Sequence, residues 1–126
     1  MFTTLLQVAA GGATGAMCRY LLGLGVLQLL GRTAFPMGVL TANVLGSFAM
    51  GVLFVTFAGR GLTHFSPLIL TGFLGGFTTF SSFSLETVDL LDKGQFGLAG
   101  LYIALSVGVS VLALTLGMAL ARGLAS

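Results

Sequence analysis

The chain has 126 residues, of which 56% are hydrophobic and only 6% are charged, and its net charge is +2. Soluble domains carry roughly 25% charged residues, so this composition excludes an ordinary soluble fold. The few basic residues are scattered along the chain, which argues against a nucleic-acid-binding patch. The single cysteine and single histidine exclude an intrachain disulfide and argue against a zinc site built from those residue types.

Four apolar segments account for almost the whole chain. A helix that crosses a membrane needs about 20 apolar residues, and each segment reaches that length. The segments predict helices at about residues 4–30, 37–58, 67–91 and 96–121. Short turns connect them, and the first is expected at 31–36, where Pro36 suits a helix start. We therefore predict one all-α integral membrane domain over residues 1–126, with no room for a soluble domain.

The third segment differs from the others at its centre. A pair of glycines and then a pair of threonines lie there: Gly75, Gly76, Thr78 and Thr79. Each glycine in a helix interior costs about 1 kcal/mol, so the pattern predicts a helix that is broken near mid-membrane, at 75–79. Lipid cannot hydrogen-bond the backbone groups that a break frees, and those groups must face protein, water or an ion. The break is therefore a candidate functional position.

Polar side chains repeat along one face of two other segments. Asn43 and Ser47 are separated by four residues, and so are the successive members of a second set, Tyr102, Ser106 and Ser110. Taken alone, either stripe is more typical of hydrogen bonding between membrane helices than of a pore. Beside a broken helix, however, these polar groups favour a pore lining.

Two phenylalanines, Phe80 and Phe83, follow the predicted break amid five Ser and Thr hydroxyls. A phenyl ring has a positive edge, so two rings turned edge-on hold an anion without a buried cation, and Asn43 adds an N–H donor. By spacing alone, the alternative of core or lipid-facing aromatics among the chain's 11 phenylalanines is favoured. The sequence carries no catalytic triad, zinc-protease or P-loop motif, so we predict that the protein is not an enzyme.

The charges near the segment ends do not select an orientation. Cytoplasmic loops normally carry an excess of Lys and Arg. Here Arg60 and Arg122 lie on one side of the predicted bundle, and Arg32 and Lys93 lie on the other. One weakly specified orientation is compatible with this tie. The alternative is insertion in both orientations, which permits an antiparallel homodimer.

Residues 72–86 read GFLGGFTTFSSFSLE and resemble the signature of the Fluc fluoride channels, also called CrcB proteins. Residues 38–46 resemble the second-helix motif of that family, and the segment around Arg19 resembles its first-helix motif, so the similarity covers essentially the whole chain. The resemblance implies a multi-pass, dual-topology antiparallel homodimer in the lipid of a bacterial inner membrane. It also implies passive fluoride export, through two pores built by both subunits, which lowers the cytoplasmic fluoride concentration.

The same resemblance assigns roles to individual residues. The ring edges of Phe80 and Phe83 would meet fluoride, and the Asn43 amide would donate to it. Main-chain carbonyls of Gly75 and Thr78 would hold a structural sodium ion at the dimer centre. Three hydroxyl residues match the track along the family's fourth helix: Tyr102, Ser106 and Ser110. Glu86 matches the vestibule carboxylate of the family, and Arg19 matches its first-helix arginine.

One position departs from the family pattern. The residue four places after Ser110 is Leu114, and the next hydroxyl belongs to Thr115. One residue rotates a helix position by about 100°. Thr115 is therefore not assigned to the predicted pore.

Two other kinds of membrane protein fit a chain of this size. A small multidrug transporter also has four helices, but it needs a carboxylate in its first helix, and residues 5–30 contain Arg19 and no acid. A non-conducting membrane subunit would use its glycines and serines only to pack helices. Fluoride efflux from liposomes that contain this protein alone distinguishes such a subunit from a channel.

Overall fold

Four long apolar helical stretches make up the computed structural model, which describes residues 1–32 and 35–125, with only the backbone of residue 125. The elements are α1 (Phe2–Leu30), α2 (Met37–Arg60), η1 (Thr63–Phe65), η2 (Pro67–Leu74), α3 (Gly75–Phe77), α4 (Phe80–Asp92) and α5 (Phe96–Ala125). Each stretch is long and apolar enough to cross a membrane, which confirms the prediction of four such helices. Thr33 and Ala34, in the turn predicted at 31–36, lie outside the described residues.

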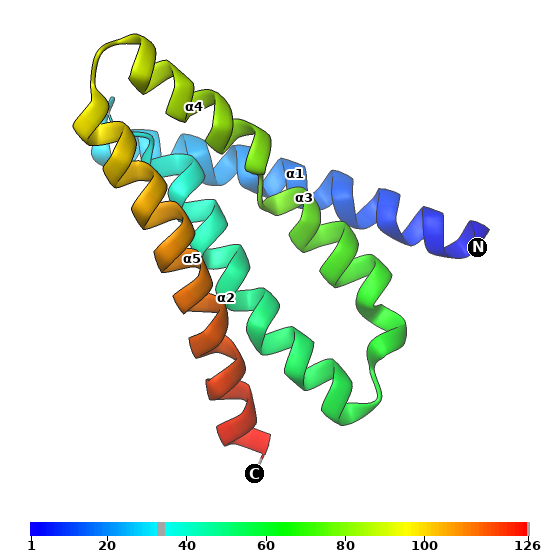
Figure 1. Ribbon diagram of the computed structural model, residues 1–126. Helices are drawn as coiled ribbons and strands as arrows, with labels where there is room; N and C mark the ends of the chain where they lie inside the picture. Colours follow the sequence, from blue (N-terminus) through cyan, green and yellow to red (C-terminus); the bar gives the residue numbers. More distant parts are fainter. Residues whose placement is uncertain (33–34, 126) are drawn as a thin grey trace.

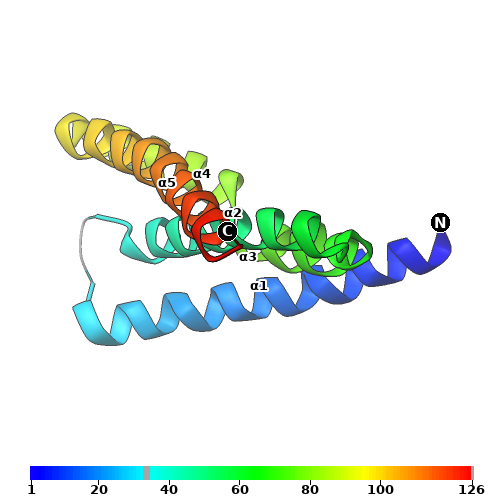
Figure 2. The same cartoon turned by 90° about the horizontal axis from the view of Figure 1, so that it is seen from below.

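The elements form two packed groups (Figure 1). α2 packs mainly against α5, and α1 packs mainly against η2 and α3. Figure 2 shows α1 along one side of the molecule and α4 and α5 along the other, with α2 and α3 between them. Since α3 contacts both α1 and α2, the stretch from η2 to α4 joins the two groups. The junction between α3 and α4 therefore lies near the middle of the molecule.

Close contact between α1 and this third stretch depends on glycines. A Cβ on Gly15 would lie 3.0 Å from the Phe77 nitrogen, and a Cβ on Gly76 would lie 3.0 Å from Cα of Gly12. Small residues at such positions let two backbones approach closely. The sequence predicts that Gly75 and Gly76 belong to the break, but both are helical in α3. Gly76 therefore does not break the helix. Its lack of a side chain lets α3 pack closely against α1.

The helical backbone stops after Phe77 and resumes at Phe80. Thr78 has φ −89° and ψ 159°, and Thr79 has φ −152° and ψ 125°, so both residues are extended. Their β-branched side chains favour this conformation. Thr79 also caps α4, because its Oγ1 accepts a hydrogen bond from the Ser82 N–H at 3.2 Å. The extended segment is thus shorter than 75–79 and consists of two threonines.

Two small apolar clusters hold the helices together. In the first, Leu70 and Leu74 of η2 pack with Phe57 of α2; η2 is a π-helix, a rare form that the sequence patterns do not predict. The second cluster joins α4 to α5 and includes Phe83 and Tyr102. Many other large apolar side chains, especially on α1 and α5, are exposed, as expected of helices that face lipid or another subunit.

Candidate functional site

A pocket of about 350 Å³ lies between α2, the interruption after α3, the start of α4 and the middle of α5. We call it the central pocket. It is lined by Asn43, Gly46, Ser47, Met50, Thr78, Thr79, Phe80, Phe83, Ser106, Val107, Ser110, Val111 and Leu114. Among the described residues, its lining offers an amide, hydroxyls and aromatic rings but no ionisable side chain. A guest that needs hydrogen-bond donors without a fixed charge fits such a lining.

Five residues that the sequence predicts for a fluoride pore meet in the central pocket. They come from α2, α4 and α5 and are Asn43, Phe80, Phe83, Ser106 and Ser110. Two further predicted pore residues, Glu86 and Tyr102, lie outside its lining. The pocket therefore collects residues that are far apart in the sequence but does not contain the whole predicted set.

The two phenylalanine rings of the site touch each other but differ in exposure. Their centroids are 5.4 Å apart and their planes are inclined by 51°. Phe83 is 9% exposed, whereas Phe80 is 76% exposed. The Phe80 side chain is therefore largely uncovered in a single chain, and one wall of the central pocket is open.

Asn43 pairs with the extended backbone of Thr79 through two hydrogen bonds. Its Nδ2 donates to the Thr79 carbonyl at 3.0 Å, and its Oδ1 accepts from the Thr79 N–H at 2.8 Å. The backbone N–H can only donate, so this pairing determines which end of the amide carries the oxygen. One N–H of Asn43 is used in the pairing, and the second remains for another acceptor. Asn43 thus fastens α2 to the interruption and keeps one donor.

The hydroxyls on α5 have two different environments. Tyr102 is fully buried, and its OH donates to Glu86 Oε2 at 3.3 Å. The Oγ atoms of Ser106 and Ser110 are also buried. Ser106 Oγ lies near the Tyr102 hydroxyl, but neither serine makes a hydrogen bond of ordinary geometry within the described part of the chain. Since most buried hydroxyls in proteins are paired, these two are the best candidates to donate to a guest in the central pocket.

Thr115 does not continue this stripe. Its side chain is exposed, and its Oγ1 donates to the Val111 carbonyl at 2.9 Å. Leu114 lines the central pocket in its place.

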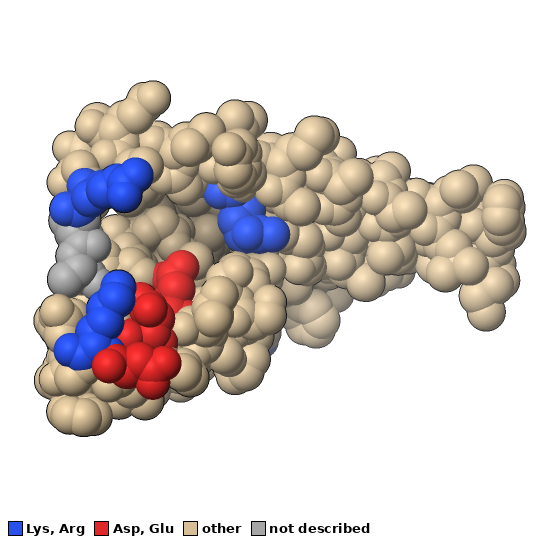
Figure 3. All heavy atoms as spheres, turned by 90° about the horizontal axis from the view of Figure 1, so that it is seen from above, with Lys and Arg blue, Asp and Glu red and all other residues tan. Residues whose placement is uncertain are grey.

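Arg19 and Glu86 lie on a second hollow, of about 340 Å³, that is lined by α1, the start of α2 and α4. The Arg19 Nε donates to the Gly76 carbonyl at 3.3 Å, so this intramembrane guanidinium has a backbone partner beside the interruption. Figure 3 shows basic and acidic side chains gathered around a hollow at one end of the molecule. Ser82 also lines the second hollow, whereas Phe80 and Phe83 of the same helix line the central pocket.

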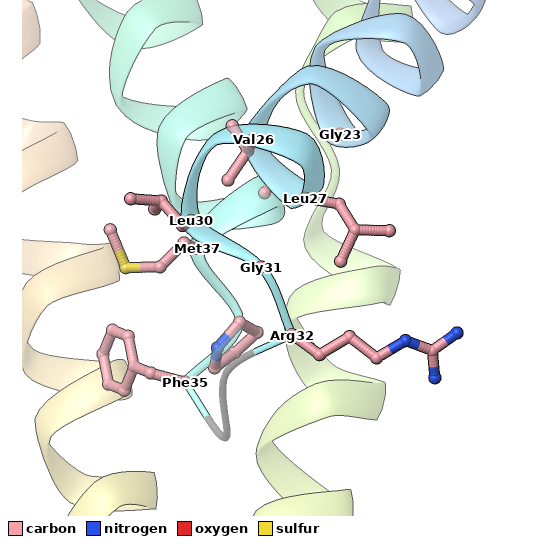
Figure 4. A pocket seen from close by; sticks show the side chains of 10 residues that line it. Gly23, Val26, Leu27, Leu30, Gly31, Arg32, Phe35 and Met37 are labelled. Atoms are coloured by element: carbon pink, nitrogen blue, oxygen red, sulfur yellow. The ribbon is translucent and has the colours of Figure 1, made fainter.

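A third hollow, of about 400 Å³, lies where α1 ends and α2 begins. Figure 4 shows mainly apolar side chains in its lining, with the Arg32 side chain extending away from them. It contains none of the predicted site residues.

Sequence reasoning missed the part that Thr79 plays in the site. Thr79 caps α4 and holds Asn43. The cap has a sequence signal, because a threonine directly before a helix commonly accepts a hydrogen bond from the N–H three residues later. The pairing with Asn43 has no such signal, since the two residues are 36 positions apart. Only the packing of α2 against the interruption brings them together.

Comparison with known proteins identifies the family of this chain. The family model described as CrcB-like protein, Camphor Resistance (CrcB), matches residues 6–118. The chain belongs to the CrcB family. Among its relatives, the fluoride-specific ion channel FluC of Ruegeria sp. (strain TM1040) is 60% identical over 98% of both chains. FluC of Paracoccus denitrificans (strain Pd 1222) is 46% identical over 96% of both chains.

The family membership confirms the resemblance found in residues 72–86. FluC of Roseobacter denitrificans (strain ATCC 33942 / OCh 114) is also 60% identical, over 95% of this CrcB chain and 96% of the relative. Together with four apolar helices of membrane-spanning length, these relatives make the chain a multi-pass membrane protein.

Proposed function

We propose that this CrcB-family chain forms a fluoride-selective channel, which lets fluoride leave the cytoplasm passively across a bacterial inner membrane. Relatives that are 54–60% identical to it carry the name fluoride-specific ion channel. The observation that carries the proposal is the central pocket, whose lining combines Phe80 and Phe83 with the hydroxyls of Ser106 and Ser110, which have no hydrogen-bond partner among the described residues. A channel is a transport protein, and no enzymatic role is proposed.

The chemistry of the pocket favours a small, strongly accepting anion. The second N–H of Asn43, the two serine hydroxyls and the positive ring edges replace water around the ion. No cationic side chain lines the pocket among the described residues, so the ion is not held too tightly to leave. Chloride is larger and a weaker acceptor, and it recovers less of its dehydration cost from the same donors.

Completion of the pore requires a second copy of the chain. Phe80 is 76% exposed, and the central pocket is open on that side. An antiparallel partner would cover both, and the two-fold relation would produce two equivalent pores. The tie of basic residues at the two ends of the bundle supports insertion in both orientations, which such a dimer needs.

In this proposal, the interruption at Thr78 and Thr79 divides the third membrane-spanning segment into two half-helices. Nearby carbonyls already have partners: that of Gly76 accepts from Arg19, and that of Thr79 accepts from Asn43. Gly75 is exposed, and a Cβ there would meet only a Leu70 oxygen at 3.9 Å, so a second subunit has room to approach.

A structural sodium ion fits this position. The carbonyls of Gly75 and Thr78 would hold it, two from each subunit, because hard oxygen ligands suit such a cation. Among the described residues, no group of three His, Cys, Asp or Glu side chains offers another metal site. Sodium would supply positive charge that links the two half-helices of both subunits.

The two alternative functions have less support. A small multidrug transporter needs an acid in the first helix, but α1 contains none. A non-conducting subunit would use serines as packing contacts between helices, and such hydroxyls are normally hydrogen-bonded. Ser106 and Ser110 lack such partners within the described residues, which favours a pore.

Substitution of the ring pair tests the proposal. In liposomes that contain the purified protein alone, Phe80→Ile and Phe83→Ile should each lower fluoride efflux by about ten-fold, because the positive ring edge is lost while an apolar side chain remains. Efflux is followed with a fluoride electrode. Phe96→Ile, at an exposed position outside the pocket, is the control and should behave like wild type. Unchanged efflux in both pore variants would disprove the assignment of the central pocket.

A further inference from the structure

A groove of about 310 Å³ lies between the last two turns of α2 and the last turns of α5. Its walls come from one face of each helix and consist of Val52, Val55, Thr56, Gly59, Arg60, Ala121 and Leu124. On α2 these residues follow the spacing i, i+3, i+4, i+7 and i+8, so they form a continuous stripe along that helix. The lining is apolar except at Arg60, which ends α2, and at Thr56.

Packing nearer the middle of the molecule explains why the helices leave this space. α2 and α5 are in close contact at Gly51 and Gly117. A Cβ on Gly51 would lie 3.0 Å from the Met118 nitrogen, and a Cβ on Gly117 would lie 3.1 Å from the Val52 nitrogen. Beyond this contact, a Cβ on Gly59 would meet no atom within 4 Å. The groove therefore begins at the glycine contact and widens toward the ends of the two helices.

The position of the groove indicates an amphipathic occupant. α2 ends at Arg60 and is followed by Gly61 in the left-handed conformation, while α5 ends at Ala125. The outer end of the groove thus lies at the membrane surface, and the valine-lined remainder extends into the apolar part of the bundle. The Thr56 hydroxyl donates to the Val52 carbonyl at 2.7 Å, so Arg60 is the main donor left for a polar headgroup.

The charge distribution indicates an anionic headgroup. The sequence has only three side-chain carboxylates, and all of them lie on α4, whose end carries the Lys93–Asp89 ion pair at 2.9 Å. The end of the molecule with the groove has Arg60 and Arg122 but no side-chain carboxylate. A guanidinium pairs well with a phosphate through two parallel hydrogen bonds. No Asp or Glu side chain lies at the Arg60 end of the molecule, so an anionic headgroup complements the charge found there.

We propose that this groove binds an anionic phospholipid, with its phosphate on Arg60 and one acyl chain between Val52, Val55 and Leu124. This inference is independent of fluoride conduction, since none of the groove residues lines the central pocket. Basic residues at the ends of transmembrane helices attract anionic lipid by about 1 kcal/mol each, and the apolar walls contribute in proportion to the area that the acyl chain buries.

Lipid binding to the purified full-length protein in neutral detergent tests the proposal. Native mass spectrometry counts bound phosphatidylglycerol and, in parallel, bound phosphatidylcholine with the same acyl chains. We expect wild type to retain phosphatidylglycerol preferentially, and we expect Arg60→Gln to bind it roughly five-fold more weakly, which corresponds to the loss of one basic residue at the surface. Arg122→Gln is the matched control, because Arg122 lies at the same end but outside the groove lining, and it should weaken binding less than Arg60→Gln does.

A second variant distinguishes the contribution of the apolar groove to lipid binding from the contribution of the Arg60 charge. Gly59→Leu fills the open space of the groove while Arg60 remains, and it should also weaken phosphatidylglycerol binding. Equal binding of the two lipids by wild type, or unchanged binding in both Arg60→Gln and Gly59→Leu, would overturn the proposal. A shift of Arg60→Gln from dimer to monomer with unchanged lipid binding would also overturn it, since a second copy would then be the partner of Arg60.

Discussion

In our proposal, Asn43 is the residue that connects the stability of the site to ion binding. Its amide pairs with both backbone groups of Thr79 and retains one free N–H. A hydrophobic residue at this position would leave the Thr79 N–H and C=O without those partners. An interruption inside a membrane span depends on such side-chain partners, because lipid supplies none. One side chain can thus hold the interruption in place and present a donor to the pore.

The Asn43→Ala variant should lose both properties. We expect its unfolding free energy to fall by about 1–3 kcal/mol, the cost of leaving part-buried backbone groups unpaired, and we expect fluoride efflux to fall with it. Thermal unfolding in detergent and electrode-measured efflux provide the two readouts. Ser47→Ala, one turn further along the same pocket wall, is the control for stability. If Asn43→Ala unfolds at the wild-type temperature, the pairing with Thr79 does not stabilise the protein.

Ser106 and Ser110 give the opposite expectation for stability. Their hydroxyls are buried without partners in the described part of the chain, so removal of either hydroxyl should leave the unfolding free energy within about 1 kcal/mol of wild type or raise it. Efflux should nevertheless fall in Ser106→Ala and Ser110→Ala, because each loses a donor to the ion. A clear loss of stability with normal efflux would indicate that the serines serve only to pack helices.

At the scale of the elements, the glycines of α1 decide how closely it approaches the third stretch. Gly15 and Gly25 are on the same helix, but only Gly15 faces backbone atoms of another element, whereas a Cβ on Gly25 would meet nothing within 4 Å. Gly15→Ala should therefore destabilise the fold by about 1–3 kcal/mol through overpacking. Gly25→Ala should have no cost and should gain helix propensity. Equal unfolding temperatures for the two variants would contradict the close contact.

The sequence predicts an interruption at 75–79 because glycine and threonine pairs are unusual in the middle of an apolar span, whereas the extended backbone covers only Thr78 and Thr79. It could not say which of them leave the helix, since a glycine serves equally well for a bend and for close packing. The contact of Gly76 with Gly12 across two elements assigns that glycine to packing. The π-helical form of η2 also lacked a pattern in the sequence, because helix period alone does not distinguish such local variants.

At the scale of the whole molecule, the four helices were predictable because membrane-spanning length and apolar composition depend only on local sequence. The central pocket was predictable in part. Helical spacing placed Ser106 and Ser110 on one face, and family resemblance joined them to Phe80 and Phe83. Tyr102 and Glu86 pair with each other beside the pocket and do not line it. The spacing of residues in the sequence could not distinguish these two from the residues that line the pocket. That distinction depends on how α4 packs against α5.

The ring of Phe80 and many other large apolar side chains are exposed in the single chain. In our proposal, a second antiparallel copy closes the pocket, and the carbonyls at the interruption share a sodium ion. The groove proposed to bind lipid lies at the opposite end of the bundle from the acidic residues of α4. Taken together, these proposals give a single chain separate surfaces for its partner, for lipid and for the ion.

The most direct test of this account is ion efflux from liposomes that contain only the purified protein, with matched vesicles loaded with fluoride or with chloride. Reconstitution is carried out with and without sodium. If the chain forms a fluoride-selective channel, fluoride efflux should be rapid in the presence of sodium, and chloride efflux should be no faster than from protein-free vesicles. Absence of fluoride efflux under both conditions, or equal efflux of the two anions, would contradict it.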